Sequence, residues 1–274
     1  MEGNSPLNDD KRAVRDFWDR ASCGEELYLE GHGAEDYRAQ ADVRYRLEPF
    51  IPEFAEFERW KGKSVLEIGV GLGADHQRFA EAGALLTGMD LSERAIGHTR
   101  RRFRESGLNA SLNIADAEAL PFPDETFDLV YSWGVLHHSP NTEQAVSEVW
   151  RVLRPGGTAK VMIYHKHSLV GYMLWIRYAL LRFRPFTPLA RIYSEYLESP
   201  GTKAYTVNEA KRLFSAFRKV DIDTVLTHGD LLSSSAGQRH RGLVLTVARI
   251  AWPRWLVRRL FPEFGLFMMV AAVK

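Results

Sequence analysis

Short runs of apolar and β-branched residues recur along the middle of the chain, and each stops at a Gly, Asp or His. Runs of this length and composition are typical of buried β-strands. Between them lie stretches whose apolar residues recur near helical spacing. Because parallel strands need crossover helices, this alternation predicts a parallel sheet. We expect strands at residues 64–70, 85–91, 110–116, 127–133 and 158–165, and helices at 74–82, 93–106 and 142–153, the last ended by Pro155-Gly156-Gly157.

The alternation stops after residue 165, and we interpret residues 166–274 as the rest of the sheet, interrupted by two insertions. Residues 166–205 are apolar and aromatic with interspersed arginines, and they end in a loop with several prolines. Thr206 is a good N-cap, and Glu209 completes a capping box for a helix to about residue 217. Strands are expected at 219–227 and 266–273, and the second insertion, 229–263, contains a Trp-rich, helix-like stretch at 243–260.

The length and composition favour one large α/β domain with insertions. The chain has 274 residues, of which 45% are hydrophobic, so it can bury a sizeable core, and disorder is excluded. We expect three parts: a helical lid at residues 1–60, which is rich in aromatic side chains, a core at 61–165, and the rest of the sheet with its two insertions at 166–274.

The formal net charge of +1 conceals an uneven distribution of charge. Residues 1–168 contain 20 Lys and Arg against 28 Asp and Glu, a balance of −8, whereas residues 169–274 contain 16 against 7, a balance of +9. One interpretation is a set of solvated helix faces. The other is a basic surface that attracts an anionic substrate, a phospholipid surface or a nucleic acid. Composition leaves both interpretations open.

Cysteine content and hydropathy favour a soluble, cytoplasmic protein. Cys23 is the single cysteine, so no intramolecular disulfide and no cysteine-based zinc cluster can form, as is usual in a reducing compartment. The first ten residues are polar and acidic, and we expect no signal peptide. No apolar run reaches the roughly 20 residues that span a bilayer, since the best stretch, 169–181, is short and contains Arg177.

Three alternate glycines provide the most specific motif. The predicted strand Val65-Leu66-Glu67-Ile68 runs into Gly69, Gly71 and Gly73 and then into a helix. Without Cβ atoms, this loop can turn sharply and approach a ligand at the carboxyl edge of the sheet. A plain tight turn has the same letters, but Asp90 and Asp116 end the next two strands, where they can accept hydrogen bonds from ribose hydroxyls and an adenine amino group. The pattern therefore indicates a nucleoside ligand.

The motifs of residues 64–165 resemble, in order and spacing, those of class I S-adenosylmethionine-dependent methyltransferases, in particular the type 11, UbiE-like members. They are Glu67-Ile68-Gly69-x-Gly71-x-Gly73, Asp90-Leu91-Ser92, Asp116-Ala117-Glu118-Ala119-Leu120-Pro121-Phe122, Phe127-Asp128, Val135-Leu136-His137-His138 and Leu153-Arg154-Pro155-Gly156-Gly157. The resemblance implies a Rossmann-like, doubly wound sheet of seven strands, mostly parallel with an antiparallel C-terminal hairpin, and helical cap insertions. It implies S-adenosylmethionine as cofactor, S-adenosylhomocysteine as product, and cofactor contacts from Glu67, Gly69, Gly71, Gly73, Asp90, Leu91, Asp116, Ala117 and Trp133. For Trp133, core packing is an equal alternative.

Dehydrogenases are the main competitor for a glycine loop with a downstream acid. Their fingerprint is Gly-x-Gly-x-x-Gly, whereas the third glycine of this chain comes one residue early. The Leu-Pro-Phe and Leu-Arg-Pro-Gly-Gly motifs also have no place in that fingerprint. We rank a dehydrogenase far below a methyltransferase.

Methyl transfer from a sulfonium needs mainly an aligned acceptor and the exclusion of water. A general base matters when the acceptor is a hydroxyl or a protonated amine. His137 is our first candidate and His165 our second, although a histidine in such a turn can instead pack or cap it. We expect no metal. Candidate acceptor contacts are Tyr28, His32, His138, Tyr164, Arg239 and Arg241.

The aromatic insertions favour a small, apolar or ring-bearing acceptor such as a quinone, a lipid intermediate or a secondary metabolite. A nucleic-acid methyltransferase is the alternative enzyme, but no RNA-binding module is recognisable and the net charge is small. A binding protein without turnover is a third, less favoured class. For residues 169–183 and 252–261 we favour packing over the pocket, with peripheral membrane contact as the alternative. We expect a monomer or a homodimer.

Overall fold

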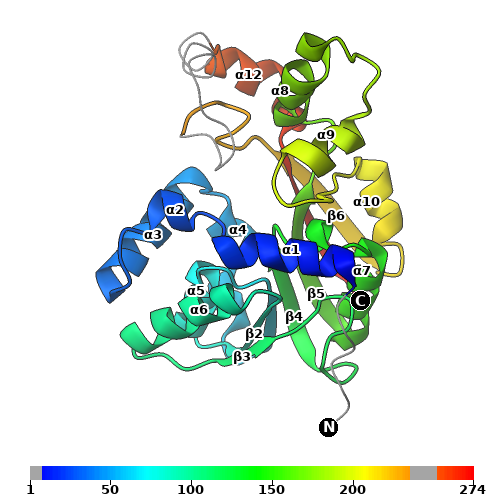
Figure 1. Cartoon of the computed structure of the whole chain (residues 1–274). Coiled ribbons are helices and arrows are strands. Elements are labelled where there is room, and N and C mark those ends of the chain that lie inside the picture. The colour runs from blue at the N-terminus through cyan, green and yellow to red at the C-terminus, as the bar shows by residue number, and fades with distance from the viewer. Residues whose placement is uncertain (1–7, 235–251) are drawn as a thin grey trace.

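The computed structural model describes residues 8–234 and 252–274, and its centre is a seven-stranded sheet with the order β3-β2-β1-β4-β5-β7-β6 (Figure 1). All neighbouring strands are parallel except β5 with β7 and β6 with β7, which are antiparallel. This is the predicted architecture. The strands are β1 (Ser64–Ile68), β2 (Leu85–Asp90), β3 (Ser111–Ile114), β4 (Phe127–Trp133), β5 (Leu153–Tyr164), β6 (Lys219–Val225) and β7 (Phe267–Val273).

The fifth strand begins earlier than the sequence predicts. Helix α7 (Thr142–Val152) ends one residue before the expected position, and β5 starts at Leu153 instead of residue 158. The segment Pro155-Gly156-Gly157 lies inside the strand, where the register with β4 shifts between Phe127 and Leu129. These residues therefore form an irregularity in a continuing strand, because the chain is already paired with β4 at Leu153.

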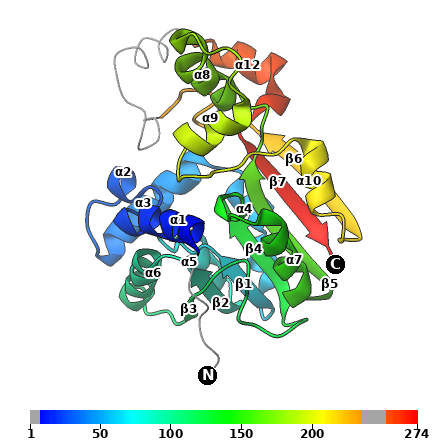
Figure 2. The same cartoon turned by 45° about the vertical axis from the view of Figure 1, so that its right-hand side comes forward.

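Two layers of helices cover the sheet (Figures 1 and 2). On one face, α7 and α10 (Val207–Leu213) pack on the strands around buried Val149 and Phe214. On the other face, buried Phe79 joins a cluster formed by three short elements. These are α4 (Ile51–Ala55), η1 (Phe57–Trp60) and α5 (Ala74–Glu81), with α6 (Glu93–Glu105) beside α5.

The predicted capping box at the start of α10 is confirmed. Thr206 Oγ1 accepts a hydrogen bond from the Glu209 amide at 3.1 Å, and a Glu209 carboxylate oxygen accepts one from the Thr206 amide at 2.7 Å. The helix itself is shorter than expected, because it ends at Leu213 and not near residue 217.

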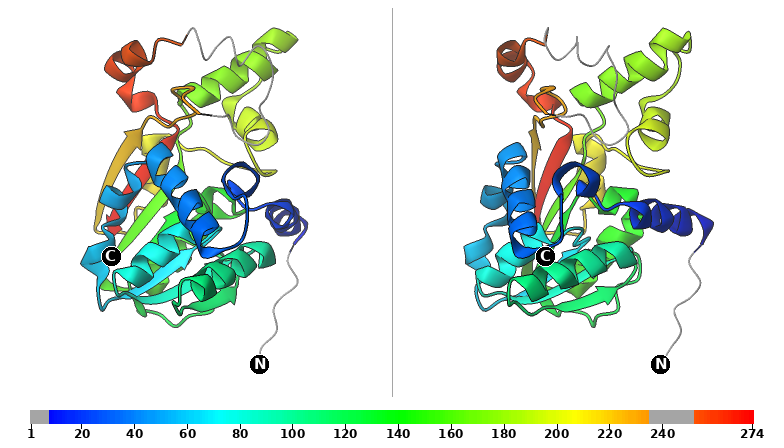
Figure 3. Two further views of the ribbon diagram at one scale, coloured as in Figure 1. Left: turned by 90° about the vertical axis from the view of Figure 1, so that its left-hand side faces the viewer. Right: turned by 60° about the vertical axis from the view of Figure 1, so that its left-hand side comes forward.

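The insertions project from the edge at which the parallel strands end (Figure 3). We call the segments 166–205 and 229–263 the cap; both leave the sheet at this edge, after β5 and between β6 and β7. The described cap elements are α8 (Leu169–Tyr178), η3 (Leu180–Arg182), α9 (Leu189–Tyr196), α12 (Arg254–Leu260) and η4 (Pro262–Phe264). Of the helix predicted at 243–260, residues 243–251 lie outside the described residues. Within residues 8–234 and 252–274, no helix has the length and apolar character needed to cross a bilayer.

From here on we use the name lid for helices α1 (Asp9–Arg20), α2 (Glu25–Tyr28) and α3 (Ala34–Leu47) of the predicted lid at 1–60, because α4 and η1 pack against the sheet; a buried arginine ties α3 to the core. The Arg102 side chain, on α6, donates to the Tyr37 carbonyl at 2.9 Å and to Gln40 Oε1 at 2.8 Å, both in α3. It also donates to the Leu72 carbonyl in the glycine loop at 3.1 Å. One side chain therefore fixes the lid against both α6 and the loop.

Candidate active site

A cavity of about 750 Å³ lies at the carboxyl edge of the sheet, between the lid and the cap. It lies where the strand order reverses, between β1 and β4, the usual ligand position in open α/β sheets. The nine residues expected to contact the cofactor all line it: Glu67, Gly69, Gly71, Gly73, Asp90, Leu91, Asp116, Ala117 and Trp133. Folding thus brings these nine side chains and backbone segments to one cavity.

The glycine loop fits a ligand that lies against its backbone. Gly69 and Gly71 have φ angles of +84° and +52°, in the left-handed region that favours glycine. A Cβ on Gly69 would lie 2.0 Å from Val135 Cγ2, so this glycine is needed for packing. A Cβ on Gly71 would meet no atom within 4 Å, so it would occupy open space in the cavity. Gly71 therefore leaves open space beside its backbone, as expected for a loop that approaches a ligand.

Asp90 holds the glycine loop as well as facing the cavity. One carboxylate oxygen accepts a hydrogen bond from the Gly71 amide at 3.1 Å, and the other accepts one from the Ser92 amide at 2.9 Å. Burial raises the pKa of Asp90 to about 6, although these backbone hydrogen bonds act in the opposite direction. A carboxylate oxygen has more than one lone pair, so the group retains acceptor capacity for ribose hydroxyls.

The lid reaches the expected adenine end of the cavity through Lys11. Its ammonium lies 2.5 Å from a carboxylate oxygen of Asp116 and 2.6 Å from one of Glu118. The sequence motifs do not indicate Lys11, because nothing local relates a helix residue to an acid 105 positions later. The contact places α1 over the acid expected to meet the adenine.

A charged cluster lines the part of the cavity next to Gly73. Arg44, on α3, binds both carboxylate oxygens of Asp75, with distances of 2.6 and 3.1 Å. The hydroxyls of Tyr45 and Tyr131 also donate to Asp75, at 3.0 and 2.9 Å. Arg44, Asp75 and Glu48 line the cavity together with Glu67. Of these four, sequence analysis identified only Glu67, because the others lie outside the motifs.

Two of these carboxyls titrate abnormally. Burial raises the pKa of Glu48 to about 7, although Arg44 acts in the opposite direction. Burial, together with the nearby Asp75 charge, also raises the pKa of Glu67 well above its usual range. Such carboxyls gain from a ligand cation, because a positive charge stabilises their ionised form.

His138 faces the cavity and is held by residues of the cap. Its Nδ1 lies 2.8 Å from Ser199 Oγ and 3.1 Å from Thr202 Oγ1. Its Nε2 lies 3.3 Å from a carboxylate oxygen of Glu198, which also lines the cavity. Tyr164 donates its hydroxyl to Glu198 at 2.7 Å. Glu198 is a further residue that the sequence motifs do not indicate, because it lies in an insertion about sixty positions beyond the histidine motif.

The two histidines expected to act as base lie behind the cavity wall. His137 is fully buried, its ring centroid is 4.0 Å from that of Tyr164, and neither nitrogen has a hydrogen-bond partner among the described residues. Burial lowers its pKa well below the usual range. His165 lies with Nδ1 3.2 Å from the Gly265 carbonyl. Neither is among the residues that line the cavity, whereas His138 is, so the geometry favours His138 over both.

The residues expected to contact the acceptor differ in their position relative to the cavity. Tyr28 and Tyr164 line the cavity with His138. His32 is not among the lining residues, and its exposed ring lies 5.5 Å from that of His98 on α6. Arg239 and Arg241 lie outside the described residues.

One group of side chains within residues 8–234 and 252–274 has the chemistry of metal ligands. His137, His138 and Glu198 place their ligand atoms within 4.8 Å of one another. Within this group, Glu198 accepts from Tyr164 and His138 Nδ1 contacts Ser199 and Thr202, whereas both nitrogens of His137 and the Nε2 of His138 have no hydrogen-bond partner among the described residues. The absence of a metal stays a prediction.

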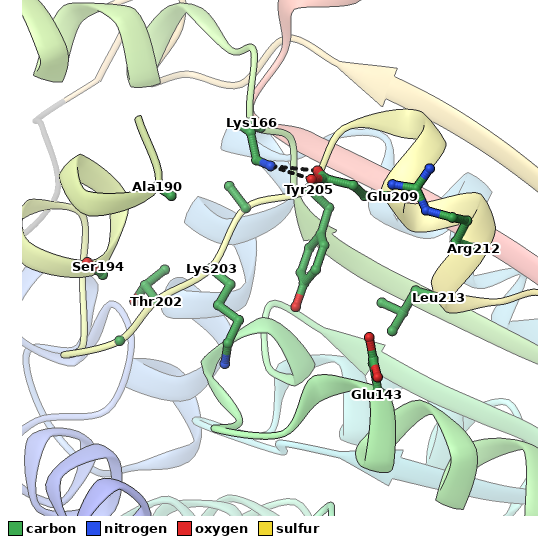
Figure 4. Close-up of a pocket in the computed structure, with 12 residues that line it drawn as sticks. Glu143, Lys166, Ala190, Ser194, Thr202, Lys203, Tyr205, Glu209, Arg212 and Leu213 are labelled. Atoms are coloured by element: carbon green, nitrogen blue, oxygen red, sulfur yellow. Dashed lines mark hydrogen bonds and ion pairs between the residues drawn. The ribbon is translucent and has the colours of Figure 1, made fainter. Parts of the chain in front are cut away.

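A second hollow, of about 810 Å³, lies on the other side of segment 199–205 (Figure 4). Its two lysines are engaged within the chain. Lys166 binds both carboxylate oxygens of Glu209, at 2.6 and 2.7 Å, and Lys203 donates to the Ser139 and Pro140 carbonyls. These contacts join the cap to the core. The residues of the glycine motif do not line this hollow but line the cavity of about 750 Å³.

In sequence, the chain resembles known methyltransferases over the core of the sheet. Residues 65–157 match the family model of a methyltransferase domain. The demethylmenaquinone methyltransferase of Tropheryma whipplei is 32% identical over 151 residues, which are 54% of this chain and 62% of that protein. The phosphatidylethanolamine N-methyltransferase of Cereibacter sphaeroides is 37% identical over 125 residues, 45% of this chain and 61% of that protein. The matches span about three fifths of these relatives.

The fold is similar to that of phosphoethanolamine N-methyltransferase 2 of Haemonchus contortus, solved with phosphomonomethylethanolamine and S-adenosylhomocysteine. The TM-score is 0.59 at 18% sequence identity, and the alignment covers 95% of this chain and 60% of that one. At this identity the likeness concerns the fold alone.

Proposed function

Because this chain belongs to the class I S-adenosylmethionine-dependent methyltransferases, we propose that it methylates a small acceptor with an apolar body. One observation carries the proposal. The residues of the cofactor motifs and a set of apolar cap side chains line the same cavity, so a methyl donor and an apolar acceptor fit side by side. The apolar cap side chains in the cavity wall include Val170, Met173, Leu174, Ile176, Leu181, Leu232 and Trp252.

The donor's methionine end would lie beside the charged cluster. When bound, S-adenosylmethionine supplies an activated methyl group on a cationic sulfonium. Glu48 and Glu67 offer carboxylates for its positive charges, and Arg44 offers a guanidinium for its carboxylate. Asp90 and Asp116 would hold the ribose and the adenine. These contacts orient the donor, and the lid excludes water from it.

The acceptor would meet the donor beside His138. If the acceptor is a hydroxyl or a protonated amine, the Glu198 carboxylate, which lines the cavity, would take up its proton and pass it to His138 Nε2 across 3.3 Å. Ser199 and Thr202 fix the ring through Nδ1. A neutral imidazole is the form that accepts a proton, and its buried Nε2 would receive the proton through Glu198.

The names of the relatives support an acceptor with an apolar body. Demethylmenaquinone and phosphatidylethanolamine, as the matched enzymes are named, each join a reactive head to long apolar chains. The apolar cap wall of this cavity suits such a body, while His138 and Glu198 suit the polar head.

Calorimetry with S-adenosylhomocysteine and methyl-transfer assays with radiolabelled donor test the proposal. The acceptor panel is a demethylated quinol, phosphatidylethanolamine, a sterol and bulk transfer RNA. We expect S-adenosylhomocysteine to bind and label to enter one of the three apolar acceptors. Absence of binding would contradict the donor assignment, and label in RNA alone would contradict the acceptor class.

A further inference from the structure

The end of the molecule formed by the cap exposes large aromatic side chains. Phe183 and Phe186, in the segment after η3, are 94% and 97% exposed, and Trp255 on α12 is 71% exposed. Leu260 on α12 is 57% exposed. We call the segments 180–186 and 254–261 the cap tips. They lie at the same end of the molecule, on either side of the cap (Figure 3).

The backbone at Phe183 is strained to present this side chain. Phe183 has a φ of +57°, in the left-handed region, at the C-cap of η3. Glycine is the residue that usually occupies such a position, because a Cβ there crowds the backbone. Burial of the ring does not compensate for this cost, since the ring is almost fully exposed. The position therefore points to a contact outside the chain.

Arginines are frequent in the two stretches of sequence that contain these aromatic residues. Residues 169–190 contain three arginines and residues 231–262 contain six, and neither stretch contains an Asp or Glu. Arg182 and Arg184 flank Phe183, and Arg258 and Arg259 follow Trp255 one turn later, and all four are exposed. Exposed aromatic residues together with arginines are the combination that a membrane interface with anionic headgroups favours.

The same helix that leads to one cap tip also lines the cavity. In α8 and η3, Met173, Leu174, Ile176 and Leu181 line the cavity, and Phe183 follows two residues later. An apolar molecule at the cap tips would therefore be adjacent to the apolar wall of the cavity.

We propose that the cap tips bind the surface of an anionic phospholipid bilayer, so that the cavity takes its acceptor from that bilayer. The binding part of this inference rests on the exposed residues, and the delivery part rests on the proposed function. A bilayer is favoured over a protein partner because the two tips are separate projections at one end, which an extended planar surface contacts together. Because neither stretch contains an acidic residue, both have a positive net charge, which complements the negative charge of anionic headgroups.

Flotation with vesicles of phosphatidylcholine, with and without phosphatidylglycerol, tests the inference. We expect the protein to float with phosphatidylglycerol vesicles and to dissociate as salt is raised. The double variant Phe183→Gly with Phe186→Ser should weaken this binding by about tenfold or more, because it removes two apolar side chains from the interface. Since glycine tolerates the φ of residue 183, the melting temperature of this double variant should not fall below that of the wild type.

A charge-reversal variant and two matched controls separate the contribution of the arginines from that of the aromatic side chains. Arg182→Glu with Arg184→Glu should abolish the preference for phosphatidylglycerol. Leu85→Ser removes an exposed apolar side chain at the start of β2, and Arg104→Glu reverses an exposed arginine on α6, so both should bind vesicles as the wild type does. S-adenosylhomocysteine should bind all variants with wild-type affinity.

Two results would overturn the inference. One is a wild-type protein that ignores phosphatidylglycerol vesicles at low salt, and the other is vesicle binding that the cap-tip variants do not reduce. A dimer that is lost in the Phe183→Gly, Phe186→Ser protein, without vesicle binding, would assign the tips to a second copy of the chain instead. Failure of S-adenosylhomocysteine to bind would contradict the proposed function and leave the vesicle result to be judged separately.

Discussion

At the scale of single residues, some positions beside the cavity contribute to packing, whereas others face the space where we expect a ligand. Gly69 and Gly71 both have positive φ, yet only Gly69 packs against another side chain, Val135. His137 and His138 are neighbours, yet only His138 lines the cavity. Substitutions at adjacent positions should therefore have opposite consequences for folding and for function.

Gly71→Ala should fold but bind S-adenosylhomocysteine at least about tenfold more weakly. Its methyl group would enter open space where we expect the cofactor, and the left-handed φ costs about 1 to 2 kcal/mol. Gly69→Ala should instead lower stability by more than this, because its Cβ would lie 2.0 Å from a Val135 methyl. Urea unfolding and calorimetry measure the two effects. Equal affinity in Gly71→Ala and wild type would remove Gly71 from the cofactor site.

His138→Ala should lower turnover by roughly 10² to 10⁴, with cofactor affinity nearly unchanged, if the acceptor must lose a proton. His137→Ala should mainly lower stability, because the ring is fully buried against Tyr164. Single-turnover assays with thermal unfolding distinguish the two. Full activity in His138→Ala would mean that positioning alone drives the transfer.

Cofactor affinity should increase with pH between about 5 and 8. The pKa of Asp90 is raised to about 6 and that of Glu48 to about 7, both by burial, so these groups are mostly protonated at pH 5 and ionised at pH 8. Ionised carboxylates bind the ribose hydroxyls and the donor's positive charges better, which predicts an increase of about tenfold, or 1.4 kcal/mol. Calorimetry across this range measures it. Glu48→Gln should remove the upper part of the titration, and an unchanged profile in that variant would exclude Glu48.

At the scale of secondary-structure elements, the position of the lid depends on a few buried polar contacts. Arg102 joins α6 to α3 and to the glycine loop, and Lys11 joins α1 to the acids after β3. These charge-assisted hydrogen bonds join elements that are far apart in the sequence.

Arg102→Met should lower the free energy of unfolding by about 2 kcal/mol or more, because it leaves the Tyr37 and Leu72 carbonyls and Gln40 without their donor. It should also make the lid more sensitive to proteolysis and weaken cofactor binding. Arg104→Met, on the same helix with a side chain 72% exposed, is the matched control and should be neutral. Similar unfolding curves for both variants would contradict this account of the lid.

At the scale of the whole molecule, lid, sheet and cap all contribute to the lining of one cavity, so ligand binding should stabilise the three parts together. S-adenosylhomocysteine at 100 times its dissociation constant should add about 2.7 kcal/mol, which raises the melting temperature by roughly 5 to 10 °C at this chain length. Differential scanning calorimetry measures the shift, and Asp90→Ala should reduce it at the same ligand concentration. A second transition that does not move with ligand would show that the cap unfolds separately.

The sequence by itself determined the approximate positions of the strands, the parallel arrangement of the first five, and the residues at the carboxyl edge from Glu67 to Asp116, whereas the antiparallel end was implied by the family resemblance. These follow from local patterns, since apolar runs, glycine spacing and strand-ending acids need no knowledge of distant segments. Only the tertiary structure decided that Lys11 meets Asp116, that Arg44 meets Asp75, and that Glu198 meets His138. Contacts between residues tens of positions apart depend on how insertions pack, which no local period encodes. For the same reason, the apolar spacing of 169–183 could not distinguish side chains that face the cavity, such as Ile176, from Phe183, which faces outward.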